Sequence, residues 1–128
     1  MKCSRRHVCF CIPAVIASRG LAAETPIPSM AVRFEDLPVQ SGGGRAFRRI
    51  LEGKTHSGFG IEIHETELAS GAMPHPPHHH AHEEAFLIRE GTLEVTISNR
   101  ASRLGPGSVA YVASNEEHGL RNAGATRA

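Results

Sequence analysis

The sequence predicts a single small domain with an all-β fold. Its 128 residues, 40% of them hydrophobic, suffice for one globular core but not for two ordinary ones. Short apolar segments are separated by turn residues along most of the chain, and no stretch after residue 23 shows helical periodicity of useful length. Many short strands with closely spaced turns are typical of a β-sandwich or a β-barrel.

The clearest of the expected strands covers residues 92–98. Leu93, Val95 and Ile97 would share one face there, with the period of two that marks a strand with one buried side. The other expected strands are residues 31–37, 45–51, 59–68, 85–89, 108–112 and 118–122. Glycine, proline and asparagine mark the turns between them, among them two turns between residues 99 and 107.

The first 23 residues resemble an export signal. A basic start precedes an uncharged, mostly apolar run at residues 8–17, and small residues suited to cleavage stand just before Glu24. The run is far shorter than the roughly 20 residues that a membrane-spanning helix needs. The pair Arg5-Arg6 resembles the start of a twin-arginine signal. We therefore expect a periplasmic or secreted protein with a linker at residues 24–30 and one domain at 31–128. A disordered N-terminal tail is the alternative.

Charge and cysteine content limit the partners and ligands of the domain. The chain has a formal net charge of +1, and without its first 23 residues it has ten basic and 13 acidic side chains, which leaves −3. This balance gives no reason to expect nucleic acid or, after signal cleavage, a membrane surface as a partner. All three cysteines precede residue 24. A metal in the domain must therefore bind through nitrogen and oxygen.

The run from His78 to Glu84 is the most informative stretch of the sequence. Side chains two residues apart on a strand face the same way at about 7 Å, so His78 and His80 could reach one ion. Glu84 has the same parity but would lie about 20 Å from His78 on a straight strand, so the chain must bend at residues 81–83. His118, which opens a strand just after a turn, is the natural fourth ligand. The alternative is a solvated histidine-rich loop.

These residues resemble the two sequence motifs of the cupin family. The first motif reads H-x-H, three residues, E, six residues, G, and corresponds to His78, His80, Glu84 and Gly91. The second reads G, five residues, P-x-G, two residues, H, three residues, N, and corresponds to Gly107, Ala113, Asn115, His118 and Asn122. The resemblance covers residues 71–122. It implies a cupin-like double-stranded β-helix, or jelly-roll barrel, that holds one divalent metal.

Three positions depart from the cupin motifs, and none of them is a ligand position. Gly71 precedes His78 by six intervening residues where the family usually has five, Ala113 replaces the motif proline, and Asn115 replaces a glycine. Asparagine tolerates the left-handed backbone conformation better than other non-glycine residues. We therefore expect the turn at Asn115 to keep its shape.

The ligand set leaves the metal and the reaction open. Three imidazoles and one carboxylate suit Mn, Fe, Co, Ni, Cu or Zn, and on an octahedral ion they would leave two positions for water, dioxygen or a substrate. The cupin resemblance covers dioxygenases, isomerases, decarboxylases and non-catalytic binders. Three hypotheses follow: a metal-dependent enzyme, foremost an oxidoreductase, for a small oxygen-rich molecule; a non-catalytic small-molecule or metal binding module; and a structural domain stabilised by its metal.

No side chain stands out as a catalytic residue. The general bases that strand parity admits are Glu62, His64, Glu94 and Tyr111. Among the other histidines, His79 has the opposite parity and should face away, whereas His82 lies in the bend and could support a ligand. His75 and His64 are expected at the surface or in the lining of a pocket.

The C-terminal end is the expected weak point of the barrel. Cupins usually continue past the position of Asn122 into a further strand, but residues 123–128 are small and polar. We therefore expect a barrel that lacks its last strand, with an open sheet edge beside the strand that bears His118. A partner subunit in a homodimer could cover that edge, or the chain could be a truncated form of a longer domain.

Overall fold

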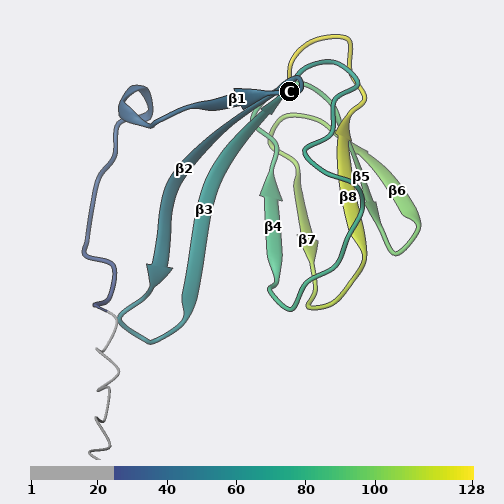
Figure 1. Cartoon of the computed structure of the whole chain (residues 1–128). Helices are drawn as coiled ribbons and strands as arrows, with labels where there is room; N and C mark the ends of the chain where they lie inside the picture. Colours follow the sequence, from purple (N-terminus) through teal and green to yellow (C-terminus); the bar gives the residue numbers. More distant parts are fainter. Residues whose placement is uncertain (1–24) are drawn as a thin grey trace, which may run out of the picture.

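A computed structural model describes residues 25–128 and confirms the all-β prediction (Figure 1). The strands are β1 (Gln40–Gly42), β2 (Arg45–Lys54), β3 (Gly60–Leu68), β4 (Glu84–Leu87), β5 (Leu93–Ile97), β6 (Arg100–Leu104), β7 (Val109–Val112) and β8 (His118–Asn122). The proposed export signal lies outside the described residues. Within residues 25–128, no helix has the length and apolar character needed to cross a bilayer.

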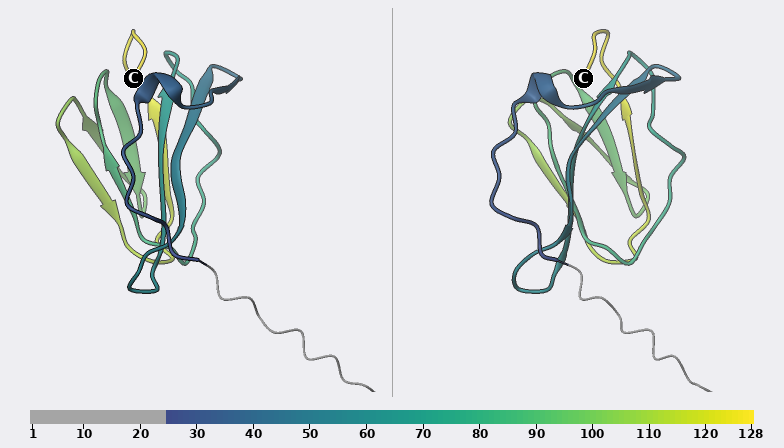
Figure 2. Two further views of the ribbon diagram at one scale, coloured as in Figure 1. Left: turned by 90° about the vertical axis from the view of Figure 1, so that its left-hand side faces the viewer. Right: turned by 60° about the vertical axis from the view of Figure 1, so that its left-hand side comes forward.

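The strands form three small antiparallel sheets. Their orders are β1-β2-β3, β4-β7 and β6-β5-β8. The sheet of β1–β3 converges with the others near the C-terminus and splays away from them at its opposite end (Figure 1). Residues 25–39 run along the side of this sheet that faces away from β4 (Figure 2). The described residues thus form a barrel that is wide at one end.

Two differences from the predicted strands have physical reasons. The expected strand at residues 31–37 is wrong, because Phe34–Asp36 forms a 3₁₀ turn in which the amides of Asp36 and Leu37 donate back to Arg33 and Phe34. The prediction also missed β1 and β6. The first four residues of β6 are small or charged and exposed, so they form an edge strand without apolar alternation.

One face of the β2–β3 pair points toward the core. Phe47 and Leu68 are buried, and the strand register sets Phe47 opposite Thr66 and Arg49 opposite His64. Side chains directly opposite one another share a face, so these residues and Leu68 all project to the same side. We call this side the inner face of β2–β3.

Charged side chains on the other face fasten this sheet to the rest of the molecule. Arg48 pairs with Glu65 at 3.0 Å and also with Glu67. Arg89, just after β4, reaches Glu65 at 3.0 Å, and Arg127 pairs with Glu67. The Arg48 hydrogen bond is the main cause that lowers the pKa of Glu67. These pairs connect the sheet of β1–β3 to the chain after β4 and to the C-terminal segment.

The expectation of an open edge beside His118 is wrong. Residues 71–80 run along the outer side of β8, where the amide of Gly71 donates to Asn122 and that of Asn122 donates to Ala72. Residues 123–128 form no named strand, but Ala128 and Leu68 exchange two backbone hydrogen bonds of 2.8 and 3.0 Å. The C-terminal segment therefore closes the narrow end of the barrel.

The motif residues outside the ligand set occupy tight turns. Gly91 has φ +75°, and a Cβ there would lie 2.5 Å from the Cβ of Ala128, so the C-terminal segment can pass only over a glycine. Asn115 has φ +61°, which is the left-handed conformation expected for this substitution. Gly107 also lies in this region, at φ +82°.

Asn122 is fully buried and joins three chain segments. Its Nδ2 donates to the carbonyls of Leu68 at 2.9 Å and Thr126 at 2.7 Å, and its Oδ1 accepts from the amide of Gly124 at 2.9 Å. An amide side chain can satisfy all three partners at once, which an aliphatic residue cannot. Asn122 therefore connects β8, β3 and the C-terminal segment.

Substitution of Asn122 by alanine should destabilise the fold by about 3 kcal/mol, because it leaves buried carbonyl and amide groups without partners. Urea unfolding followed by circular dichroism measures the change. The exposed amide of Gln40 provides the control, since its replacement by alanine should cost less than about 0.5 kcal/mol. Equal stability of the two variants would contradict this role for Asn122.

Candidate metal centre

The segment before β4 brings distant histidines together through its backbone. His78 and His118 exchange two backbone hydrogen bonds of 3.0 and 2.9 Å, which form an isolated antiparallel bridge. Two residues further on, the amide of Asn115 donates to the carbonyl of His80 at 2.7 Å. Residues separated by about 40 positions in the sequence are thereby held side by side.

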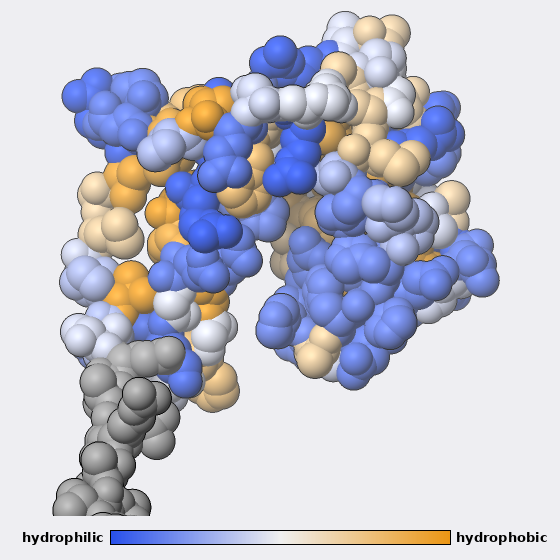
Figure 3. Space-filling view, in the orientation of Figure 1, coloured by the Kyte–Doolittle hydropathy of each residue, from blue (hydrophilic) through white to orange (hydrophobic). Residues whose placement is uncertain are grey.

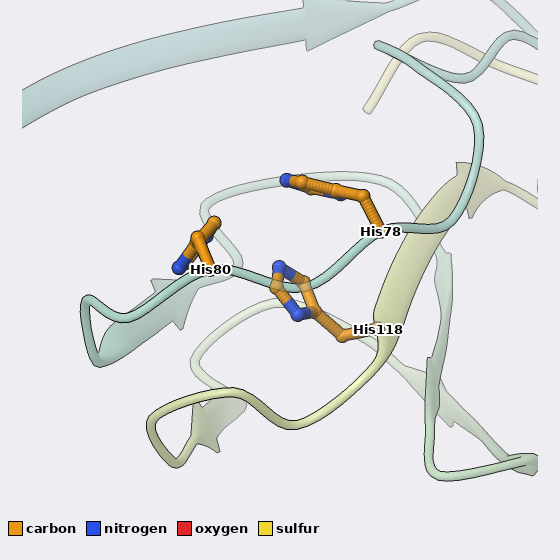
Figure 4. A group of neighbouring side chains, drawn as sticks. All are labelled: His78, His80 and His118. Atoms are coloured by element: carbon orange, nitrogen blue, oxygen red, sulfur yellow. The ribbon is translucent and has the colours of Figure 1, made fainter.

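Three of the four predicted ligands form a compact group. Ligand nitrogens of His78, His80 and His118 all lie within 4.8 Å of one another, so the group could hold a metal ion (Figure 4). The fourth, Glu84, places Oε2 3.0 Å from Nε2 of His118 and 3.3 Å from Nε2 of His80. The structure thus brings all four predicted residues to one place.

The predicted bend accounts for the position of Glu84. Residues 81 and 82 form a bend, and Glu84 is the first residue of β4, as the parity argument required. Ser114 fixes this bend, because its hydroxyl donates to the carbonyl of Ala81 at 2.8 Å. The chain reverses between His80 and Glu84, so Glu84 is not separated from His78 by the length of a straight strand.

Backbone carbonyls determine which ring nitrogens are free. Nδ1 of His80 lies 2.9 Å from the carbonyl oxygen of His82, and Nδ1 of His118 lies 2.9 Å from that of Glu116. A carbonyl oxygen only accepts, so each Nδ1 must carry the proton. In the neutral rings, the lone pairs are then on the Nε2 atoms that face Glu84.

This arrangement fits a cation between the side chains. The Nε2 atoms of His80 and His118 lie 3.3 and 3.0 Å from Oε2 of Glu84. Their lone pairs and the carboxylate repel one another unless a positive charge lies among them. Ligand atoms bound to one ion at about 2.1 Å and at right angles are about 3.0 Å apart, which agrees with the distances around Glu84. Protonation of both rings is the other way to relieve the repulsion.

His78 supplies an independent indication. Its Nδ1 is buried and has no hydrogen-bond partner among the described residues. Burial is the main cause that lowers the pKa of His78, and the nearby rings of His75, His118 and His80 lower it further, whereas Glu84 opposes them. The neutral ring is therefore favoured, and a neutral ring is the form that binds metal.

The remaining histidines lie around this group. His79 and His75 are exposed, and the His75 ring packs edge-on against His78 with centroids 4.2 Å apart. His82 is also exposed, but its carbonyl holds the His80 ring in place. Support from His82 thus comes through its backbone, which side-chain parity does not predict.

The structure separates the four candidate general bases. Tyr111 is exposed and hydrogen bonds with Glu83, which raises the pKa of the phenol. Glu94 pairs with Arg121 at 2.9 Å on the face of the β5–β8 pair opposite to His118. Both are engaged away from the histidine group. Glu62 and His64 instead lie on the inner face of β2–β3.

Comparison with known proteins identifies the family. The cupin domain profile matches residues 64–128, about half of the chain. The chain belongs to the cupin family. The jelly-roll prediction is therefore confirmed, and the histidine group lies in the part of the chain that defines the cupin domain.

Solved cupins of several kinds share the fold. An RmlC-like cupin from Shewanella frigidimarina has a TM-score of 0.60 and 17% identity, over 81% of this chain and 86% of the other. A predicted oxalate decarboxylase from Thermotoga maritima has 0.64 and 18%, over 77% and 91%. A sugar phosphate isomerase from Silicibacter pomeroyi has 0.63 and 17%, over 77% and 70%. No curated protein matches this chain. These identities establish the fold alone.

Replacement of His80 or Glu84 by glutamine should weaken metal affinity by more than about tenfold, since even residues that only support a ligand typically change it that much. Competition with a fluorescent chelator measures the affinity for Zn²⁺. His79→Gln is the matched control, because its exposed ring belongs to the same run but faces away. Equal affinity of all three variants would exclude this ligand set.

Proposed function

We propose that this cupin binds one divalent transition metal through His78, His80, Glu84 and His118 and acts as a metal-dependent oxidoreductase on a small oxygen-rich molecule. The observation that carries the proposal is the set of Nε2 atoms facing Glu84 at 3.0 and 3.3 Å, with their tautomers held by backbone carbonyls. Such outer hydrogen bonds are typical of metal-binding histidines.

The donor set supports a catalytic metal. Three nitrogens and one oxygen without a thiolate suit Mn, Fe, Ni, Cu or Zn, and an octahedral ion would have two further positions for a ligand. When bound, such a metal supplies Lewis acidity or, as iron, copper or manganese, electron transfer. The side chains of His80 and Glu84 are 28% and 27% exposed, so the group is accessible from solvent.

The expected size and chemistry of the substrate have two supports. A hollow separates the sheet of β1–β3 from the remaining strands (Figure 3), which leaves room for a small molecule. Relatives of the same fold are named as an oxalate decarboxylase, by prediction, and a sugar phosphate isomerase, and both names refer to small molecules rich in oxygen. The class of substrate proposed for this chain follows from these two supports.

Export and assembly are further parts of the proposal. Residues 1–23 would direct the chain to the periplasm or the outside of the cell. A homodimer is supported by apolar side chains that the described monomer exposes, among them Leu87 at 73% and Val109 at 63%, which face each other on β4 and β7. Nucleic acid and membranes are not proposed as partners of the mature domain.

A second candidate is a non-catalytic role in which the metal binds or stabilises. It is favoured by the position of the ligands on both sides of the His78–His118 bridge, where an ion would fasten residues 71–80 to β8. In that case binding to the folded state would raise stability by mass action, without any reaction.

The oxidoreductase proposal predicts dioxygen uptake by the iron-loaded protein with a small phenolic, dicarbonyl or hydroxycarbonyl compound. An oxygen electrode measures the rate, and Glu84→Gln should abolish it together with iron binding. His79→Gln should keep it. Tight substrate binding by the iron-loaded protein without oxygen uptake or product would contradict the enzyme and favour the binding module.

The stabilising role predicts a separate result. Removal of the metal with a chelator should lower the melting temperature by several degrees, because a ligand that binds only the folded state stabilises it. Differential scanning calorimetry at fixed pH measures the shift, with Glu84→Gln as a control that should not respond. An unchanged melting temperature of the native sequence would exclude a structural metal.

A further inference from the structure

Glu62 and His64 form a side-chain pair on the inner face of β2–β3. Nδ1 of His64 lies 3.7 Å from Oε1 of Glu62, and the imidazole packs on the Phe47 ring with centroids 5.0 Å apart at 40°. Phe47 is buried, so it fixes one side of the imidazole. Arg49, at 3.7 Å, approaches Glu62 from the neighbouring strand. The pair is therefore oriented by packing and by charge.

The contact between Asn122 and Leu68 places His64 at about the same level as His118. Nδ2 of Asn122 bonds to the carbonyl of Leu68 at 2.9 Å, which aligns the ends of β8 and β3. Both strands run toward this point (Figure 1). His64 and His118 each lie four residues before it, about 13 Å back along their strands. An even number of steps keeps both side chains on the faces of buried Leu68 and Asn122.

The space between the sheet of β1–β3 and the other strands is open at this level. The sheet of β1–β3 diverges from the other strands toward the level of the histidines (Figure 1), and the hollow between the two parts is visible on the surface (Figure 3). The His64 side chain is 36% exposed although it lies on an inward face. The face of β2–β3 that carries His64 therefore looks toward the hollow and toward the strands on its other side.

The partner of His64 determines which ring nitrogen carries the proton. A carboxylate beside Nδ1 favours the tautomer that carries its proton there, and Nε2 then keeps a lone pair. Such a carboxylate also stabilises the imidazolium that forms when Nε2 accepts a proton. The 3.7 Å separation is long, but hydrogen bonds of catalytic groups often tighten only when a substrate binds.

We propose that His64, oriented by Glu62, is the proton-transfer residue of this site, and that its substrates are small hydroxycarbonyl compounds. This proposal rests on the proposed metal site, where a metal held by the histidine group would supply Lewis acidity to the substrate carbonyl. The C–H bond beside the carbonyl breaks, its proton goes to Nε2 of His64, and its electron pair forms the carbon–carbon double bond of an enediolate. Return of the proton regenerates the carbonyl compound, so the step needs no oxidant.

The first experiment tests the placement of His64 without any turnover. Protein labelled in its histidine rings is loaded with Zn²⁺ or with paramagnetic Mn²⁺ and compared by NMR. We expect Mn²⁺ to broaden the His64 ring signals strongly and to affect those of His56, in the exposed turn between β2 and β3, far less. Equal behaviour of the two rings would overturn the facing arrangement.

The second experiment follows proton transfer itself. Zn²⁺-loaded protein is incubated with hydroxyacetone in D₂O, and the loss of the C–H signal beside the carbonyl is recorded by NMR. His64→Gln should slow this exchange by about 100-fold or more, the usual effect of losing a general base. Glu62→Gln should slow it less, and His56→Gln should not change it. The zinc content of each variant is measured in the same samples.

The outcomes separate this proposal from the proposed function. Exchange that is slowed strongly by His64→Gln and less by Glu62→Gln, at full zinc content and with His56→Gln unchanged, supports the proton-transfer role even if the iron-loaded protein consumes no dioxygen. Exchange by His64→Gln at the rate of the unaltered protein would overturn it. Binding of hydroxyacetone to the unaltered zinc protein without exchange would also overturn it, while the metal site would stand.

Discussion

Two reciprocal backbone hydrogen bonds between His78 and His118 join the segment before β4 to β8, and the site depends on them. They set one histidine beside the other from segments about 40 residues apart. The amide of Asn115 then holds His80, and the bend at residues 81 and 82 returns the chain to β4 with Glu84 at its first position.

The bridge is supported at the other end of β8. Asn122 binds Leu68 and the C-terminal segment through its side chain, and Gly91 leaves the space over which that segment passes. These contacts align β8 with β3 at the narrow end of the barrel, while the opposite end stays open. The contacts at the narrow end therefore fix how β8 lies relative to β3, and the histidine group lies toward the open end.

Electrostatics explains why the four side chains suit a cation. The carbonyls of His82 and Glu116 bind the Nδ1 protons, so neutral His80 and His118 present lone pairs to the carboxylate of Glu84. The fold holds these groups near one another although they would repel without a positive charge. Nδ1 of His78, a residue of the same histidine group, is also buried without a hydrogen-bond partner among residues 25–128. A metal ion would satisfy the whole group, because each neutral ring and the carboxylate offers it a lone pair.

Much of this could be predicted from the sequence, because strand parity and motif spacing depend only on local geometry. Parity placed His78 and His80 together and required the bend before Glu84. The strand Arg100–Leu104 was missed, since its small and charged residues carry no alternation. The cover of residues 71–80 over β8 was missed too, because it consists of backbone hydrogen bonds that side-chain patterns do not report. The role of the His82 carbonyl was missed for the same reason, although it acts on a ring only two residues away. The pairing of Glu62 with His64 is local to β3, whereas the packing of His64 on Phe47 depends on tertiary structure.

X-ray absorption spectroscopy of the metal-loaded protein tests the central claim most directly. The account predicts a shell of nitrogen and oxygen ligands at about 2.0–2.2 Å, with the multiple-scattering signature of three imidazoles and no sulfur. A metal surrounded by oxygen alone, or by fewer than two imidazoles, would contradict the assignment of His78, His80, Glu84 and His118 as its ligands.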